Sequence, residues 1–457
     1  MSGLPVRQGV LTSLQYQIMA LSKYDAIVVG SGMGGMCAAA RLTARGFKVL
    51  VAEKSRYLGG RCSHRVRRDC IVTTGAIMIP MGPNSAIREA FDVVGAEMDM
   101  VDITGRMRYR LAHGDYDVPP GGGGLYGMIE FAMQNPTTAQ QLFQHIRDAL
   151  LGWMPLNDIS ILEWFDQYTD NREVKNLFQG YCASLMGTNL HEIPAGEFFR
   201  FLKDSSKGTR FGLAANGNGR LMEALAEAIR KHGSDIRCNY SCKQIDIENN
   251  KVTGITVSNA ENQEERILAD CVISNCGPDR TVELAGGDSL FEKSYITRLR
   301  SHDVEAPIYH VSFVMDEPLI KDFDGCLVFG NTKNLIYLES PSVISPALAP
   351  SGKYLHTAYG APTDASNPNL KGELKTVLDE LEENFPGMSE KADFLVKAKH
   401  HGRSPGMHRW VGYSMPVDTP VRGLYNVGDG CALPGTIGTE GSAASAREVT
   451  AKICGDA

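Results

Sequence analysis

Residues 24–53 constrain the fold of this 457-residue chain more than any other segment. An apolar run ends at Gly30, which is typical of a buried parallel strand, and Gly30, Gly32 and Gly35 give the spacing G-x-G-x-x-G. An alanine-rich segment follows, and a second apolar run ends in Glu53. A glycine-rich turn alone is weak evidence, but strand, turn, helix, strand and acid in this order predict a β-α-β unit that binds a dinucleotide.

The residues of this unit have distinct physical tasks. Gly30 permits the tight turn, Gly32 lets the backbone approach a pyrophosphate, and Gly35 lets the helix pack close to the strand. The helix N-terminus directs its N–H groups and its positive dipole end toward the phosphates. Glu53 accepts hydrogen bonds from ribose hydroxyls and repels a 2′-phosphate. The predicted dinucleotide contacts in this segment are Gly30, Ser31, Gly32, Met33, Gly34, Gly35, Glu53 and Lys54.

Residues 53–61, EKSRYLGGR, resemble the pattern E-x-x-R-x-x-G-G-R of the flavin amine oxidase and phytoene desaturase superfamily. Taken alone, they also fit an ordinary surface turn. Two distant segments, 423–430 and 438–447, resemble the C-terminal flavin motif of the same superfamily. The resemblance implies FAD as a non-covalent cofactor, with a diglycine turn and its arginine around the pyrophosphate. The residues that it assigns are Gly60, Arg61, Gly428, Asp429, Gly438, Thr439, Gly441 and Ser442.

The C-terminal motif has chemistry that suits a flavin. Asp429 follows an apolar run, so its carboxylate is placed to bond the ribityl hydroxyls. A helix that opens near Gly441 directs amides toward the flavin N1–O2 edge, where negative charge collects on reduction.

The resemblance continues through the middle of the chain. Residues 216–245 match the helix and strand that return to the FAD domain, and the backbone of Cys242 takes the place of a residue that contacts adenine. Residues 269–278 and 349–353 resemble runs typical of the phytoene desaturase and carotenoid isomerase branch. The first of these runs contains Asn275, which is assigned to the cofactor site. A small-residue segment matches the place where the family passes along the flavin ring, and its assigned contacts are Thr74, Gly75, Ala76 and Ile77.

The motifs fall in three separated pieces, so the cofactor domain is expected to be discontinuous. The predicted fold class is α/β: a Rossmann-type FAD-binding domain, similar to glutathione reductase, with a discontinuous α+β substrate domain. The FAD-binding domain is assigned to residues 24–80, 210–285 and 405–457. The substrate domain is assigned to residues 81–209, mainly helical, and to residues 286–404, where alternation predicts antiparallel strands.

Composition narrows the class of protein. The net charge of −7 and the absence of a basic stripe argue against a nucleic-acid partner. Eleven cysteines without a C-x-x-C pair suit free thiols in a reducing cytosol, and we predict no metal site. No apolar run is long enough to predict a transmembrane helix.

Residues 1–23 are interpreted as an N-terminal extension. Leucines and an isoleucine lie there at helical spacing, which fits a short helix docked on the protein, a segment upstream of a start at Met19, or peripheral membrane contact. The expected localisation is therefore cytoplasmic, with peripheral membrane association as a variant.

His310 is the candidate catalytic residue. Amine oxidases often hold a lysine, bridged by water to flavin N5, eight residues before a proline, and His310 has that spacing from Pro318. His310 is then either a proton acceptor near N5 or a strand histidine bonded to its neighbours. Trp410 and Tyr413 precede the last FAD motif, where amine oxidases place cage aromatics, but core packing explains them equally well.

The resemblance implies an FAD-dependent dehydrogenase or desaturase that removes hydride from carbon of a hydrophobic terpenoid, carotenoid or alicyclic substrate. A redox-neutral isomerase is a close variant. A flavin amine or amino-acid oxidase is the first alternative, and a non-catalytic carrier of prenylated partners, like the Rab escort and GDP-dissociation-inhibitor proteins, is the second. The electron acceptor and the oligomeric state are left open.

Overall fold

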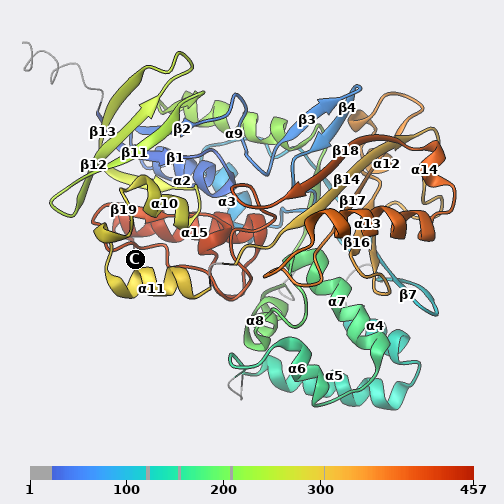
Figure 1. The fold of residues 1–457 in the computed structure, drawn as a ribbon. Coiled ribbons are helices and arrows are strands. Elements are labelled where there is room, and N and C mark those ends of the chain that lie inside the picture. The colour runs from blue at the N-terminus through green and yellow to red at the C-terminus, as the bar shows by residue number, and fades with distance from the viewer. Residues whose placement is uncertain (1–22, 120–123, 153–155, 206–208, 303, 457) are drawn as a thin grey trace, which may run out of the picture.

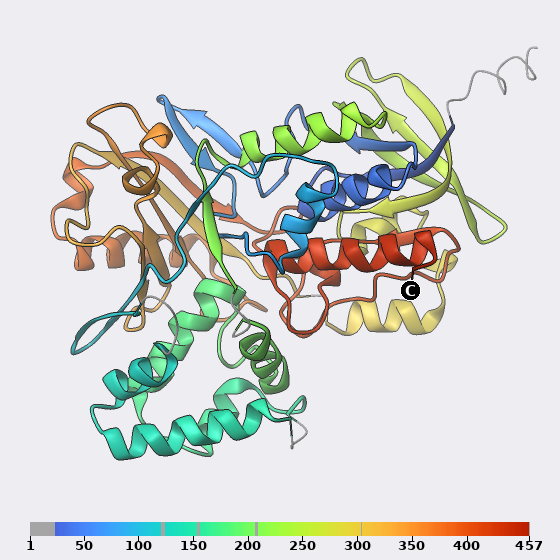
Figure 2. The ribbon, with the colours of Figure 1, turned by 180° about the vertical axis from the view of Figure 1, so that it is seen from behind.

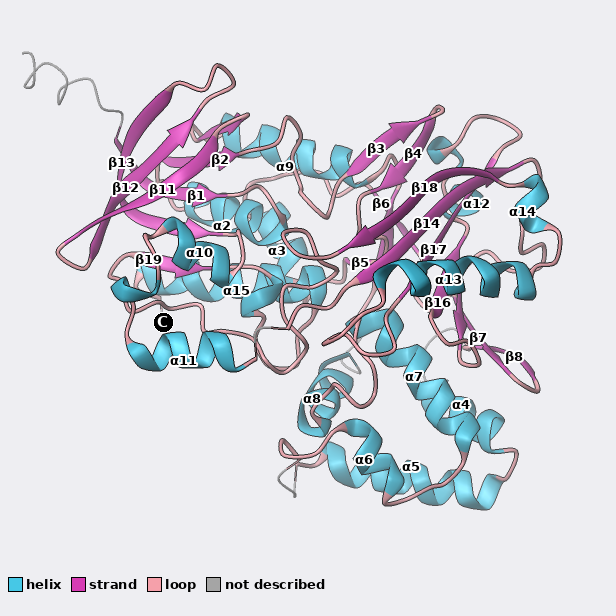
Figure 3. Cartoon of the chain, viewed as in Figure 1, coloured by secondary structure: helices cyan, strands magenta, loops and turns pink. Residues whose placement is uncertain are grey.

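The computed structural model describes residues 23–119, 124–152, 156–205, 209–302 and 304–456. Figure 1 shows two large sheets side by side, with a group of helices below the second sheet. The fold is a mixed α/β arrangement in which helices and strands alternate around the first sheet and segregate in the rest (Figure 3).

The first sheet has the strand order β10-β2-β1-β13-β12-β11, with β19 beside β13. The pairs β10–β2, β2–β1, β1–β13 and β13–β19 are parallel, whereas β11, β12 and β13 form an antiparallel meander. The strands are β1 Lys23–Val29, β2 Val49–Glu53, β10 Asp235–Cys238, β11 Ser241–Glu248, β12 Lys251–Ser258, β13 Glu264–Ser274 and β19 Leu424–Asn426.

Four helices pack around this sheet: α2 Met33–Ala44, α3 Ala86–Asp92, α9 Asn218–Lys231 and α15 Gly438–Cys454. Viewed from behind, α15 runs along α2 (Figure 2). Small residues allow this close packing, because Ala38–Ala40 of α2 and Ala443, Ala444 and Ala446 of α15 are all buried. This packing therefore holds the first and last of the described helices together beside the parallel strands.

The second sheet has the order β18-β14-β17-β16-β15-β7-β8 and is antiparallel except between β15 and β7. Helix α13, Leu370–Asn384, packs with Tyr309, Val311 and Phe313 of β14 in one apolar cluster. Alternation along the strand then turns His310 to the other face. The strands are β7 Met107–Leu111, β8 Gly114–Asp117, β14 Ile308–Met315, β15 Cys326–Phe329, β16 Leu335–Glu339, β17 Tyr354–Gly360 and β18 Asp393–His400.

The helical group lies between β7 and β9 in the chain. Its core contains Trp164, Phe165, Phe178 and Phe198, all of them fully buried, so these aromatic side chains serve helix packing. Ser160 and a glutamate three residues later form a capping box at the start of α6, and the sequence pattern S-x-x-E there is typical of one. The helices are α4 Gly124–Met133, α5 Pro136–Leu150, α6 Ile161–Asp166, α7 Arg172–Met186 and α8 Ala195–Ser205.

Short elements join these parts. A hairpin of β3 and β4 stands beside the second sheet, and a three-stranded sheet has the order β5-β9-β6. These strands are β3 His64–Arg67, β4 Cys70–Thr73, β5 Ile79–Pro80, β6 Met100–Asp102 and β9 Phe211–Ala214. The remaining helices are α10 Pro278–Leu284, α11 Lys293–Ser301, α12 Pro341–Ile344 and α14 Met388–Lys391, with 3₁₀ turns at Asp288–Leu290, Pro346–Leu348 and Asp429–Cys431.

The structure can be compared directly with the predictions about the fold. The fold class is confirmed, and the antiparallel strands expected within 286–404 are present, among them β14, β15 and β17. The first sheet takes strands from all three segments assigned to the FAD domain, whereas the division into two domains stays a prediction.

Other predictions concern the cysteines, the chain start and the membrane. All eleven cysteines are free thiols, as expected. The helical stripe at the start of the chain lies outside the described residues. Within those residues, no helix is long and apolar enough to cross a membrane.

Candidate FAD site

The predicted dinucleotide loop lies between the end of β1 and the start of α2. Gly30 has φ +98°, which L side chains rarely adopt, and a β-carbon on Gly35 would overlap the carbonyl oxygen of Gly30. Gly32 is the N-cap of α2 and provides no side-chain cap, so the first amides of the helix are left for another acceptor. Ser31, Met33 and Gly34 are buried beside them.

Glu53 ends β2 with its carboxylate turned toward this loop. Its Oε2 accepts hydrogen bonds from the backbone N–H of Ser31 at 2.8 Å and from Ser31 Oγ at 2.7 Å, and its Oε1 accepts from the N–H of Ser55 at 2.7 Å. The buried carboxylate is thus held at the carboxyl end of a parallel strand, where ribose recognition occurs in such folds. The neighbouring Lys54 is exposed.

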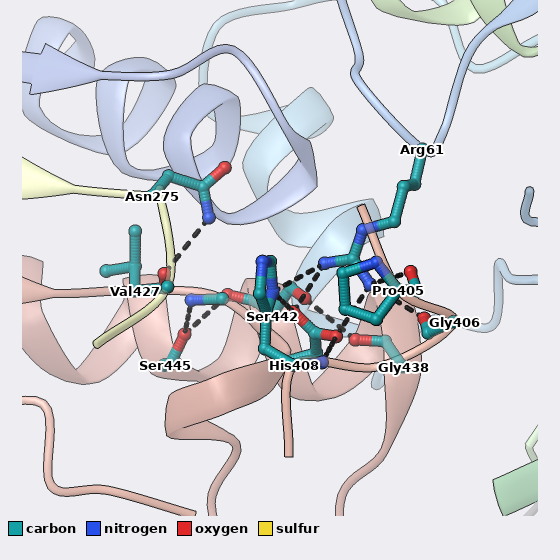
Figure 4. Close-up of polar contacts among 12 residues, drawn as sticks. Arg61, Asn275, Pro405, Gly406, His408, Val427, Gly438, Ser442 and Ser445 are labelled. Carbon is teal, nitrogen blue, oxygen red and sulfur yellow. Dashed lines mark hydrogen bonds and ion pairs between the residues drawn. The ribbon is translucent and has the colours of Figure 1, made fainter. Parts of the chain in front are cut away.

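Asn275 joins the three chain segments at the loop. It follows β13, and its Nδ2 donates to the carbonyl oxygen of Val427 at 3.0 Å (Figure 4). Its Oδ1 lies so close to Gly32 that a β-carbon on that glycine would overlap it. This contact shows why a glycine stands at the N-cap of α2.

Arg61 and Asp429 form the charged centre of the site. Arg61 Nη2 donates to Asp429 Oδ1 at 2.6 Å, Arg61 Nη1 donates to Asp429 Oδ2 at 2.8 Å, and Arg61 Nη1 also donates to the carbonyl oxygen of Gly406 at 2.7 Å. His408 donates its backbone N–H to Asp429 Oδ2 at 2.9 Å. Burial favours protonation of the Asp429 carboxyl, but Arg61 and His408 outweigh it and hold its pKa well below the ordinary value.

The N-terminus of α15 is the second helix end in the site. Its N-cap, Ile437, has no side-chain cap, and Gly438 begins the helix with φ +51°. Ser442 Oγ donates to the carbonyl oxygen of Gly438 at 2.8 Å, and Gly428 donates its N–H to Ser445 Oγ at 2.9 Å. Gly441 is closely packed, since a β-carbon there would lie 2.8 Å from that of Ala432. Thr439 lies in the same first turn.

The segment expected along the flavin ring is fixed by backbone contacts. Ala76 donates its N–H to the carbonyl oxygen of Arg61 at 3.0 Å, and its own carbonyl oxygen accepts from Asn218 Nδ2 at 2.6 Å. Tyr359 of β17 donates its hydroxyl to the carbonyl oxygen of Gly75. Thr74 Oγ1 donates to the carbonyl oxygen of Gly60 at 2.9 Å, which connects this segment to the diglycine turn. Ile77 is buried next in line.

A cavity of about 220 Å³ adjoins the C-terminal part of the site. Asp429 and Gly438 line it together with Met407, Trp410 and Ile437. The space therefore reaches the two residues that are predicted to contact the ribityl chain and the flavin edge.

These observations fit FAD. Two helix N-termini without side-chain caps converge at the carboxyl edge of the parallel strands, as binding of a pyrophosphate and of a reduced flavin edge requires. A fixed carboxylate, Glu53, stands at the end of β2, and the buried Asp429 pairs with the half-buried Arg61 between the two helix ends. Their assignment as individual FAD contacts remains a prediction.

Two assigned residues stand apart from this centre. Cys242 lies on β11, antiparallel to β12, with its thiol buried so that the pKa rises to about 12. Only its backbone is available for the predicted adenine contact. His310 lies on β14, and its ring stacks on Tyr359 with centroids 4.9 Å apart. Because Tyr359 bonds to Gly75, His310 is one side chain away from the segment assigned to the flavin ring.

The structure also places residues at the site that the sequence motifs do not name. His408 Nδ1 lies 2.9 Å from both Arg61 Nη2 and Asp429 Oδ1, although nothing in its local sequence marks it. Asn218 opens α9 after a glycine turn, and that Asn-Gly-Asn-Gly run was a signal for a special backbone position. Trp410, which the sequence did single out, donates its Nε1–H to the carbonyl oxygen of Glu305 at 3.0 Å and packs edge-on against Tyr413.

The fold and the site together define an FAD-binding oxidoreductase with a Rossmann-type sheet. Residues 33–454 match the family described as flavin containing amine oxidoreductase, and the chain belongs to this family. Its cofactor is FAD, and it is an enzyme.

Known relatives extend over most of the chain. Chloroplastic prolycopene isomerase of Arabidopsis thaliana is 24% identical in an alignment 493 residues long that covers 91% of this chain and 80% of the isomerase. The 4,4'-diapophytoene desaturase (4,4'-diapolycopene-forming) of Methylomonas sp is 25% identical over 401 residues, which cover 78% of this chain and 76% of the desaturase. The crystal structure of an oxidoreductase from Methanosarcina mazei has the same fold, with a TM-score of 0.82 at 24% identity over 93% of this chain and 99% of that chain.

Proposed function

We propose that this FAD-dependent enzyme removes hydride from carbon of an uncharged, hydrophobic substrate of the terpenoid, carotenoid or alicyclic kind, or isomerises such a substrate without net redox change. The observation that carries the proposal concerns one face of the second sheet. Its titratable side chains are uncharged near pH 7, and it faces residues 74–77, here called the segment of Gly75, which are assigned to the flavin ring. An ionised substrate would lose hydration there without meeting a counter-ion, which disfavours its binding.

Strands β14, β16 and β17 contribute four titratable side chains to this face: His310, Tyr337, Glu339 and Tyr359. Burial lowers the pKa of His310 to about 3, so that its imidazole is neutral at physiological pH. Burial raises the pKa of Glu339 to about 8, so that its carboxyl group is mostly protonated at pH 7. The pKa values of Tyr337 and Tyr359 are likewise raised by burial. The face therefore combines aromatic surface with uncharged hydrogen-bonding groups.

Sequence relationships support the same substrate class. The relatives that cover most of the chain include a prolycopene isomerase and a diapophytoene desaturase. The runs at 269–278 and 349–353 resemble those of that branch. His310 stands where amine oxidases often hold a lysine, which gives less support to a fast amine oxidase.

The chain's own residues orient the parts of the reaction. FAD, when bound, supplies the hydride-accepting chemistry. The contacts of Arg61, Asn218 and Tyr359 hold the backbone of residues 75–76 in one position, which fixes the surface against which a substrate and a cofactor ring meet. The buried sheet face excludes water from that surface.

A flavin-bleaching screen tests the proposal. The FAD-loaded protein is mixed anaerobically with a polyene or alicyclic alkene and, separately, with putrescine and cyclohexylamine. We expect bleaching of the flavin absorption, or a change of alkene geometry with reduced flavin, only with the uncharged compounds. Rapid bleaching by an amine, with hydrogen peroxide formed on admission of air, would contradict the proposal and favour the amine oxidase alternative.

A further inference from the structure

A row of polar side chains crosses the second sheet at one level. Ser312 of β14 lies opposite Thr357 of β17, Thr357 lies opposite Glu339 of β16, and Glu339 lies opposite Cys326 of β15. Residues opposite one another on neighbouring strands point to the same face, with β-carbons about 4.5–5.5 Å apart. These four side chains therefore follow one another across four strands.

Hydrogen bonds connect most of the row. His310 Nε2 lies 2.8 Å from Ser312 Oγ, and Ser312 Oγ lies 3.0 Å from Thr357 Oγ1. Glu339 stands directly across from Thr357, at the separation of about 4.5–5.5 Å between β-carbons that is usual for such pairs. The row from His310 to Glu339 thus contains two hydrogen bonds and one open step, between Thr357 and Glu339.

Glu339 has an unused hydrogen-bonding atom in the protein interior. Only 4% of the residue is exposed, and Oε1 is buried without a partner. An unpaired polar atom in the protein interior is costly, so such atoms call for an explanation. The carboxyl group also interacts with the thiol of Cys326, which is likewise buried.

The groups around the row are uncharged near pH 7. Cys326 of β15, Tyr337 of β16 and Tyr359 of β17 face Glu339, and burial raises the pKa of each. His400 of β18 lies beside His310 with ring nitrogens 3.4 Å apart, and its pKa is lowered by burial and by the positive charge of Arg61, the charged group nearest this end of the row. From the helical side, the buried thiol of Cys182 and the phenols of Tyr109 and Tyr181 all have raised pKa values.

We propose that His310, Ser312, Thr357 and Glu339 form a proton-exchanging row, in which Glu339 stores the proton and His310 is the end nearest the flavin segment. At rest the proton stays on Glu339, whose pKa lies above that of His310. When negative charge develops at the segment of Gly75, transfer breaks the O–H bond of Glu339 and forms an N–H bond at His310 Nε2. Each intervening hydroxyl gives up one proton and receives another, so no electrons move and no further reactant is needed. Glu339, Thr357 and Ser312 are positioning residues that act through His310.

This inference rests on the proposed function, because the row matters only if the segment of Gly75 lies along the flavin. Tyr359 provides the connection: its ring stacks on His310 and its hydroxyl binds the carbonyl oxygen of Gly75. A change of charge at that segment therefore acts first on His310 and then on the residues further along the row.

Infrared difference spectroscopy of the FAD-loaded protein tests the row without a substrate. The bound flavin is photoreduced with EDTA as electron donor, and reduced-minus-oxidised spectra are recorded from pH 6 to pH 10. We expect a carboxylic-acid carbonyl band that changes on reduction, disappears as the pH rises through about 8, and is absent in Glu339→Gln. A spectrum without a redox-dependent carboxylic-acid band, or a band that Glu339→Gln retains, would overturn the proposal.

Two further variants separate exchange along the row from a merely structural carboxyl group. Thr357→Val removes the connecting hydroxyl at nearly constant volume, and Thr357→Ser restores it. We expect the band to lose its redox response in the valine variant and to recover it in the serine variant. His356→Asn, on the same strand but the opposite face, is the control and leaves the response unchanged. Equal responses in the valine and serine variants would refute the row even though FAD is bound, whereas failure to bind FAD would refute the cofactor site instead.

Discussion

The guanidinium group of Arg61 and the carboxylate of Asp429 form a paired hydrogen bond at 2.6 and 2.8 Å, although the residues are 368 positions apart in the chain. The first belongs to the turn after β2, and the second follows β19. Their pairing brings the first and last motifs of the chain to one point between the N-termini of α2 and α15. The ion pair therefore stabilises the fold at the place where the cofactor is expected to bind.

Breaking this pair should destabilise the protein. Removing one partner of a buried pair costs about 3–5 kcal/mol, because the other charge remains buried without compensation. We expect Arg61→Met alone to lower the free energy of unfolding by about that amount, whereas Arg61→Met combined with Asp429→Asn costs less than the sum of the two single changes. Urea denaturation of all four proteins gives the coupling energy. Additive effects would contradict a direct pair.

Gly32→Val should yield a protein without flavin. The new side chain overlaps Asn275 Oδ1 and blocks the approach to the first turn of α2. The measurement is the ratio of flavin to protein absorbance after purification. Gly46→Ala is the matched control, since Gly46 has φ +84° but no atom within 4 Å of an added β-carbon. Full FAD occupancy in Gly32→Val would show that the predicted phosphate site is wrong.

Local patterns were sufficient to predict the first sheet. The strand ending at Gly30, the helix after it and the second strand with Glu53 are all present, because each depends on short-range hydrophobic periodicity and on glycine geometry. The capping box at Ser160 and the antiparallel strand of His310 follow from equally local signals. The boundaries between domains have no such signal.

The contacts across the second sheet could not be predicted from the sequence. The pairing of Ser312 with Thr357, and of Thr357 with Glu339, depends on the register of strands that are separated by tens of residues. Register follows from the packing of a whole face and from bulges, neither of which short motifs record. The position of His408 could not be predicted either, because only the folding of its loop brings it beside Arg61 and Asp429.

Two buried histidines should lower the free energy of unfolding as the pH falls below neutrality. The pKa of His310 is lowered to about 3 and that of His356 to about 4, chiefly by burial, so the unfolded chain binds more protons than the folded one. Their contribution is fully present above the unfolded value of about 6.5 and is lost as the pH falls below it. Between pH 7 and pH 5 we expect a loss of about 2 kcal/mol per histidine. His356→Asn should therefore show a weaker fall of the urea midpoint over this range, and an unchanged fall would contradict the assignment.

Tyr359→Phe should change the environment of the flavin while FAD remains bound. The substitution removes the hydroxyl that fixes the carbonyl oxygen of Gly75 and keeps the ring that stacks on His310. Loss of one such hydrogen bond costs about 0.5–1.5 kcal/mol, so the protein should still fold. The flavin absorption and fluorescence should shift, because the backbone expected along the ring is no longer held. Tyr309→Phe is the matched control: it loses a 2.7 Å hydrogen bond to Glu373 on the opposite face of the sheet and should leave the flavin spectrum as it was. Identical spectra in wild type and Tyr359→Phe would show that residues 75–76 do not lie beside the flavin ring.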